Sequence, residues 1–143
     1  MEIISTFRNN EKIPDKYTCN GMNINPPIKI IDYPEKTKSF ALIVDDPDAP
    51  AKTWVHWIVF NITKPIIEEN RNPFNSKRGI NDSRKLDYSG PCPPSGTHRY
   101  FFKVYALDCL LDFNEGINKE MLEKVMRNHI LAKAELIGLY SRK

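Results

Sequence analysis

The sequence predicts a sandwich-like β protein. Three segments, 39–44, 54–62 and 98–107, are short, apolar and rich in β-branched and aromatic residues, which is typical of strands. The first two carry apolar residues on both faces, as strands do when they are covered from both sides. A sheet built from such strands needs a layer above it and a layer below it, so we expect stacked layers in one domain.

Alternation along a strand assigns the faces of the two longer segments. In segment 54–62 it places one set of side chains together, namely Trp54, His56, Ile58 and Phe60, and it turns the others away, namely Val55, Trp57 and Val59. In segment 98–107 the residues that share a face are His98, Tyr100, Phe102 and Val104. Weaker strand patterns occur at 2–7 and 29–31.

Near the C-terminus the period changes to that of a helix. Asn118 can cap a helix that runs to about Lys133, with an apolar stripe of Met121, Leu122, Val125, Met126 and His129. The opposite face mixes acidic and basic residues, which disfavours a membrane-surface helix and favours one that packs on the core. Segment 134–140 then predicts a final strand.

Size and charge exclude several classes of protein. A chain of 143 residues fits one domain, 1–143. The net charge is +3 and the basic residues are scattered, so we expect no nucleic-acid binding. The N-terminus lacks the pattern of a signal peptide and no apolar run is long enough to span a membrane, which favours the cytoplasm and no membrane insertion. Segment 63–89 is polar and non-periodic, which is typical of functional or mobile loops.

The number and spacing of the cysteines bear on two kinds of structure, a four-cysteine zinc site and a secreted disulfide framework. Cys19, Cys92 and Cys109 are widely spaced and odd in number, and no pair forms a CxxC motif. This pattern excludes a four-cysteine zinc site and disfavours a secreted disulfide framework.

Polar side chains gather at the ends of the predicted strands. Asp46 and Asp48 follow the first strand, His56 lies early in the second, and His98 and Tyr100 begin the third. If these strands are neighbours, two imidazoles and one phenol converge, and their donors suit an anionic oxygen group. Trp54 would then wall the pocket. We expect Asp46 to line it and Asp48 to have a structural role.

Segment 90–94 predicts a stiff rim for this pocket. Its three prolines fix φ and lack N–H donors, while Gly90 allows a close backbone approach. A rigid connector is the plain interpretation. The functional one is a preshaped rim whose Gly90 N–H faces the anion. Whether any X–Pro bond here is cis stays open.

Several motifs together resemble the phosphatidylethanolamine-binding protein family, and most closely its bacterial and archaeal branch of YbhB/YbcL or Raf-kinase-inhibitor-like proteins. The matching stretches cover nearly the whole chain and are 21–27, 38–50, 53–57, 90–100, 104–108 and 129–138. The resemblance implies a large central antiparallel sheet, a smaller sheet and one or two flanking helices. It also implies an anion pocket for phosphate or phosphorylethanolamine-type groups, formed by Asp46, Asp48, Trp54, His56, Gly90, Pro91, His98 and Tyr100.

The chain departs from that branch at three positions. Arg84, Asp87 and Asn128 stand where the branch usually has glycine. Aspartate and asparagine tolerate positive φ better than most residues, whereas Arg84 puts the loop before Tyr88 in question. The C-terminal helix that partly shields the pocket in eukaryotic relatives is missing, so we expect a more open mouth.

The leading hypothesis is a non-catalytic binding module for a small anionic or phosphorylated ligand, with no cofactor. In it both histidines donate to the anion. The resemblance adds a kinase or phosphoprotein partner as an expectation, and it leaves a homodimer open. The alternatives are an enzyme with Cys92 as nucleophile and His98 as base, and a metal site of His56, His98 and Asp46. The absence of a basic amphipathic stripe argues against bilayer binding.

Overall fold

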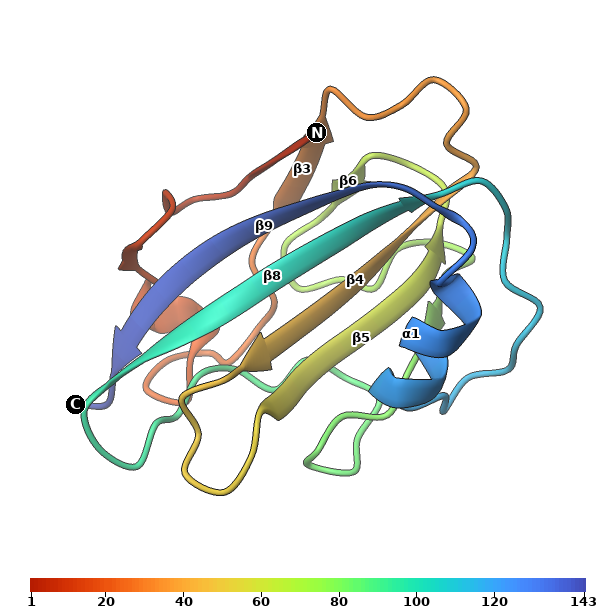
Figure 1. Ribbon diagram of the computed structural model, residues 1–143. Coiled ribbons are helices and arrows are strands. Elements are labelled where there is room, and N and C mark those ends of the chain that lie inside the picture. Colours follow the sequence, from red (N-terminus) through yellow and green to blue (C-terminus); the bar gives the residue numbers. More distant parts are fainter.

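A computed structural model describes residues 1–143. It contains two sheets, one α-helix and one 3₁₀ helix, η1 (Asp15–Tyr17) (Figure 1). The larger sheet has the strand order β2-β9-β8-β4-β5-β7 and comprises β2 (Glu11–Lys12), β4 (Ser39–Asp46), β5 (Trp54–Ile62), β7 (Lys77–Arg78), β8 (Thr97–Leu107) and β9 (Ile130–Ser141). The smaller sheet has the order β1-β3-β6 and comprises β1 (Glu2–Ile4), β3 (Ile28–Ile31) and β6 (Ile66–Ile67). All pairings are antiparallel except β2 with β9.

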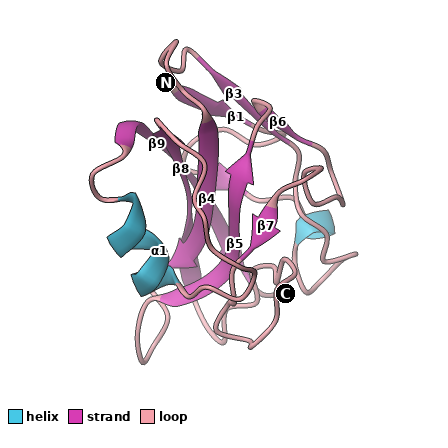
Figure 2. Cartoon of the chain, turned by 90° about the vertical axis from the view of Figure 1, so that its right-hand side faces the viewer, coloured by secondary structure: helices cyan, strands magenta, loops and turns pink.

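The large sheet is covered on both faces, as the two-sided strands predicted. One face packs against the smaller sheet, where Leu42 and Phe102 meet Ile30 in the main core. The other face packs against α1 (Lys119–Met126), whose Leu122 and Met126 are buried with residues of β4 and β5. Figure 2 shows the helix on one side of the large sheet and β1, β3 and β6 on the other. The predicted sandwich is therefore confirmed.

The helix is shorter than the sequence predicted. Asn118 caps it as expected, its side chain accepting a hydrogen bond from the Met121 N–H at 2.8 Å, but α1 ends at Met126. The residues from 130 onward, expected in part as helix, form β9 and pair with β8 along its whole length. Segment 130–136 is rich in alanine, leucine, lysine and glutamate, which favour helices locally, and pairing with a neighbouring strand overrides that preference.

A β-bulge in β5 changes which face His56 occupies. Asp45 lies opposite Val55 and Val44 lies opposite Trp57, so His56 is the extra residue between two ladder positions. Beyond the bulge, Ile58 packs on the helix side of the sheet, whereas His56 turns to the other face and contacts Tyr100 at 5.2 Å between ring centroids. The predicted common face of His56 and Ile58 was therefore wrong, because a bulge breaks strict alternation.

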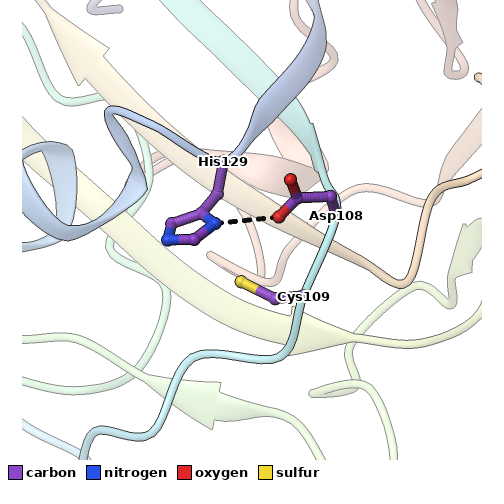
Figure 3. Close-up of side chains that lie close together, drawn as sticks. All are labelled: Asp108, Cys109 and His129. Carbon is purple, nitrogen blue, oxygen red and sulfur yellow. Dashed lines mark hydrogen bonds and ion pairs between the residues drawn. The ribbon is translucent and has the colours of Figure 1, made fainter.

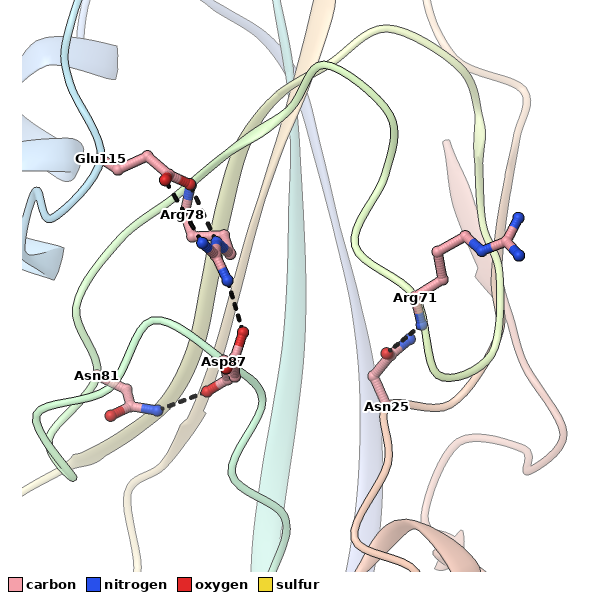
Figure 4. A network of polar contacts seen from close by, with 6 residues as sticks. All are labelled: Asn25, Arg71, Arg78, Asn81, Asp87 and Glu115. Atoms are coloured by element: carbon pink, nitrogen blue, oxygen red, sulfur yellow. Dashed lines mark hydrogen bonds and ion pairs between the residues drawn. The ribbon is translucent and has the colours of Figure 1, made fainter.

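Segment 63–89 has few apolar anchors, chiefly Ile67 and Tyr88 at the main core, and polar contacts hold much of the rest. The Arg78 guanidinium donates to Glu115 at 3.0 Å and to Asp87 at 2.6 Å, and the Asn81 amide donates to the Asp87 carbonyl at 2.9 Å (Figure 4). Across the loop, the Arg71 N–H donates to the Asn25 side-chain oxygen at 2.9 Å. Such a network needs no hydrophobic period, which is why the sequence pattern did not reveal it.

The three departures from glycine behave differently. Arg84 adopts the left-handed conformation with φ of 61°, whereas Asp87 and Asn128 do not. Arg84 therefore bears the steric cost of a backbone conformation that glycine adopts freely. All peptide bonds are trans, including those to proline.

Candidate functional site

A cavity of about 320 Å³ opens at the end of the large sheet where β4 ends and β5 and β8 begin. It is lined by Asp46, Ala49, Pro50, Trp54, His56, Ser83, Ser89, Gly90, Cys92, Pro93, Pro94, His98 and Tyr100. This volume equals roughly ten water molecules at their share of liquid volume, so it exceeds a bare phosphate and fits a small organic phosphate. The predicted convergence of His56, His98 and Tyr100 is therefore present.

Asp46 is the buried anchor of the site. One carboxylate oxygen accepts the His98 Nδ1 hydrogen bond at 2.7 Å, and the other accepts the Asp48 backbone N–H at 2.8 Å. The carboxylate thereby fixes the tautomer and the ring orientation of His98, and Nε2 is left without a partner in the chain. These two hydrogen bonds compensate part of the negative charge of Asp46, which would otherwise repel an anion in the cavity.

His56 is held in a similar way by the backbone. Its Nδ1 lies 2.6 Å from the Ser89 carbonyl oxygen and donates to it, since a carbonyl can only accept. Burial lowers the pKa of His56, and the Ser89 hydrogen bond opposes that shift only in part. At neutral pH the ring is therefore uncharged, and its Nε2 is an acceptor. His56 Nε2 can therefore donate to an anion only after the ring takes up a proton.

Tyr100 lies between the two imidazoles. Its ring stacks on His98 at 6.4 Å between centroids and meets His56 edge-on. Burial and the charge of Asp46 raise the pKa of Tyr100, so its hydroxyl stays protonated and can donate. The side chain is almost fully buried and lines the cavity, which limits the movement of that donor.

The rim, residues 90–94, and Tyr88 just before it are attached to η1 and to the loop that follows it. Cys92 forms a disulfide with Cys19, with 5.4 Å between the Cα atoms, and the Cys19 N–H donates to the Pro91 carbonyl at 3.1 Å. The Tyr88 hydroxyl donates to the Tyr17 carbonyl at 2.8 Å. The rim is thus preshaped, as predicted, but mainly through crosslinks to another segment.

This arrangement corrects three expectations. Cys19 and Cys92 form a disulfide, although the odd number and wide spacing of the cysteines disfavoured one. The sequence did not reveal it because the two residues are 73 apart and no local pattern relates them. Cys92 therefore has no free thiol and cannot be a nucleophile with His98 as base. The Gly90 N–H donates to the Asn23 side chain at 2.8 Å and does not face the cavity. Glycine is needed at position 90 because a Cβ there would clash with the Tyr17 carbonyl oxygen.

Two predicted site residues lie outside the cavity lining. Asp48 binds Arg99 through both carboxylate oxygens at 2.9 Å, and hydrogen bonds from Arg99 lower the pKa of Asp48 to about 2. Pro91 follows Gly90 on the rim but does not line the cavity. The sequence pattern did not reveal Ser83, Ser89, Ala49 and Pro50, although the last three lie within or directly beside the predicted motifs.

The proposed metal site in this pocket is not supported by the geometry. His56, His98 and Asp46 do not form a group whose ligand atoms all lie within 4.8 Å of one another. The group that meets this criterion is Asp108, Cys109 and His129, at the other end of the sheet.

Comparison with known proteins agrees with the fold. The family model described as phosphatidylethanolamine-binding protein matches residues 3–141. The chain belongs to the phosphatidylethanolamine-binding protein family. Membership in this family supports a protein that acts by binding.

Relatives in this family occur in archaea and bacteria. The chain is 51% identical to a UPF0098 protein of Methanothermobacter thermautotrophicus over 95% of both chains. It superimposes on the crystal structure of a phosphatidylethanolamine-binding protein homologue from Chlamydia trachomatis with a TM-score of 0.95 at 40% identity, covering 99% of this chain and 97% of that one. For E. coli YbcL, described as a member of the mammalian PEBP family, the TM-score is 0.90 at 28% identity, covering 99% and 98%.

The length of the single α-helix decides whether it could span a membrane. With eight residues it is too short to cross a bilayer, and no other helix in the structure could do so.

Proposed function

We propose that this family member is a non-catalytic binding module for a small phosphorylated or carboxylated ligand of the phosphorylethanolamine type. The observation that carries the proposal is the orientation of the two imidazoles. Both Nδ1 atoms are engaged by the protein, His98 with Asp46 and His56 with Ser89, so both Nε2 atoms remain available to a ligand in the cavity.

The charges of the site set a condition on the ligand. Neutral His56 offers a lone pair, while the Tyr100 hydroxyl offers a proton. A monoprotonated phosphate matches this set, because it has both an O–H donor and acceptor oxygens. A fully ionised phosphate matches it once His56 is protonated. Binding of an anion should therefore be coupled to proton uptake and should strengthen as the pH falls below the unperturbed imidazole value, because burial lowers the pKa of His56.

The aminoethyl group of phosphorylethanolamine has a partner in Asp46. Both oxygens of that carboxylate accept a hydrogen bond, but an ionised carboxylate has about four acceptor sites, so it can accept another. The same cavity chemistry suits a phosphorylated side chain, which is the basis for proposing a kinase or another phosphoprotein as partner.

Calorimetric and NMR titrations test the proposal. The ligands are inorganic phosphate, ethyl phosphate, phosphorylethanolamine and a phosphoserine peptide, with wild type, His56→Gln, His98→Gln and, as a control at the far end of the sheet, His129→Gln. We expect binding by wild type and by the control, and a loss of at least about tenfold in both pocket variants, since each leaves buried polar groups unpaired. The proposal would be refuted if the ligands caused no chemical-shift change or heat of binding in wild type, or if they caused equal changes in all four proteins.

A further inference from the structure

A second cluster of chemically capable side chains lies at the opposite end of β8 from the cavity. Asp108 and Cys109 directly follow that strand, and His129 directly precedes β9. Ten residues separate His98 from Asp108, which is about 30 Å of extended strand. In Figure 3 the imidazole, the carboxylate and the sulfur face one another. One ligand atom from each of the three residues lies within 4.8 Å of the other two.

The backbone around the cluster holds these side chains together. The Asp108 N–H donates to the His129 carbonyl at 3.0 Å, which joins the two segments directly beyond the β8–β9 ladder. The Ser39 hydroxyl donates to the Cys109 carbonyl at 2.6 Å and fixes the third residue against the start of β4. His129 Nδ1 and Asp108 Oδ1 are 2.8 Å apart, so the ring is already turned toward the carboxylate. Little rearrangement is needed for all three to address a common point.

We propose that Asp108, Cys109 and His129 form a binding site for a divalent zinc-type metal ion. Thiolate, imidazole and carboxylate are the three ligand types that Zn²⁺ takes in proteins. Ligand bonds of roughly 2.0–2.3 Å require the three atoms to approach to about 3.5 Å, which is a small closure for half-exposed side chains. The ion takes the place of the proton that His129 Nδ1 shares with Asp108, and the Cys109 thiol loses its proton on binding.

Three protein ligands leave one position of a tetrahedron open. His129 and Asp108 are each more than two-fifths exposed as side chains, so that position faces solvent and takes water. A thiol nucleophile assisted by His129 is a weaker interpretation, because burial and the neighbouring Asp108 raise the pKa of the Cys109 thiol. A reactive cysteine needs the opposite shift, whereas a metal ion removes the thiol proton by direct bonding.

The disulfide makes this proposal simple to test, because Cys109 is the one free thiol of the folded chain. Untagged, chelator-treated protein under non-reducing conditions is mixed with Ellman's reagent with and without Zn²⁺, and Co²⁺ is titrated in parallel. We expect Zn²⁺ to slow labelling of Cys109 and Co²⁺ to give a thiolate charge-transfer band. His129→Gln and Asp108→Asn retain the thiol but each remove a ligand. The Zn²⁺ concentration needed for protection should rise by more than roughly tenfold in each, because even the loss of a group that only supports a ligand costs about that much affinity.

His98→Gln is the matched control, since it alters a histidine of the cavity and leaves the cluster intact. It should be protected as wild type is. Three results would overturn the proposal. Zn²⁺ could leave the labelling rate of wild type unchanged, it could protect His129→Gln and Asp108→Asn as well as wild type, or it could fail to protect His98→Gln. Circular dichroism of each variant separates loss of a ligand from loss of the fold.

Discussion

Removal of the Cys19–Cys92 disulfide should cost about 4 kcal/mol of unfolding free energy. The bond closes a loop between residues 73 apart, and the loss of chain entropy in the unfolded state for a loop of that length gives this figure. For a chain of 143 residues, the same loss lowers Tm by about 13 °C. Three hydrogen bonds still tie segment 88–91 to η1 and the loop after it, so the double variant Cys19→Ala/Cys92→Ala should fold and keep its cavity.

The measurement is urea unfolding without reductant, compared as extrapolated free energies. Midpoints alone would mislead, because the uncrosslinked chain exposes more surface and its m-value rises. Cys109→Ser, which removes the free thiol, is the control and should change stability by less than about 1 kcal/mol. A double variant that loses less than about 1 kcal/mol, or no more than the control, would refute the reasoning that this crosslink restricts the unfolded chain.

Three further predictions concern single positions. Asp45→Asn should lower the unfolding free energy by about 2–3 kcal/mol in urea, because the buried carboxylate contacts Lys103 at 3.0 Å and Lys119 at 2.7 Å; a neutral result would show that the lysines are fully hydrated. Arg84→Gly should gain about 0.5 kcal/mol by relieving a left-handed backbone, and a loss would mean that the arginine side chain contributes more than the strain. The third concerns His56, whose pKa is lowered in the folded state, so the unfolded chain binds more protons below about pH 6.5. The unfolding free energy of wild type should therefore decrease as the pH is lowered through that range, and His56→Gln should flatten this dependence on pH. Parallel pH profiles of the two proteins would contradict a neutral His56.

The parts of the fold that sequence predicted are those where a local pattern and the tertiary environment agree. β4 and β5 are covered on both faces and carry strong apolar runs, and Asn118 is a cap in a helix that does pack on the core. The convergence of His98 with Asp46 was also predictable, because it needs only that β4 and β8 pair in register.

The remaining features depend on contacts that leave no local trace. The bulge at His56 is fixed by loop 81–89, since the Ser89 N–H and the Asn81 amide both donate to the His56 carbonyl. The Cys19–Cys92 bond joins two loops that no pattern relates. Gly90 was rightly expected at a close backbone approach, but the approaching group is the Tyr17 carbonyl and not a ligand.

The hydrogen bond between Asp46 and His98 joins residues 52 apart in the chain, on the paired strands β4 and β8. No fragment with only one of these strands can assemble the cavity, so recognition is lost together with the global fold. Any compound that occupies the cavity must then raise the melting temperature in proportion to the logarithm of its concentration once the site is saturated. A metabolite library screened by differential scanning fluorimetry can therefore identify the natural ligand, whatever its chemical class.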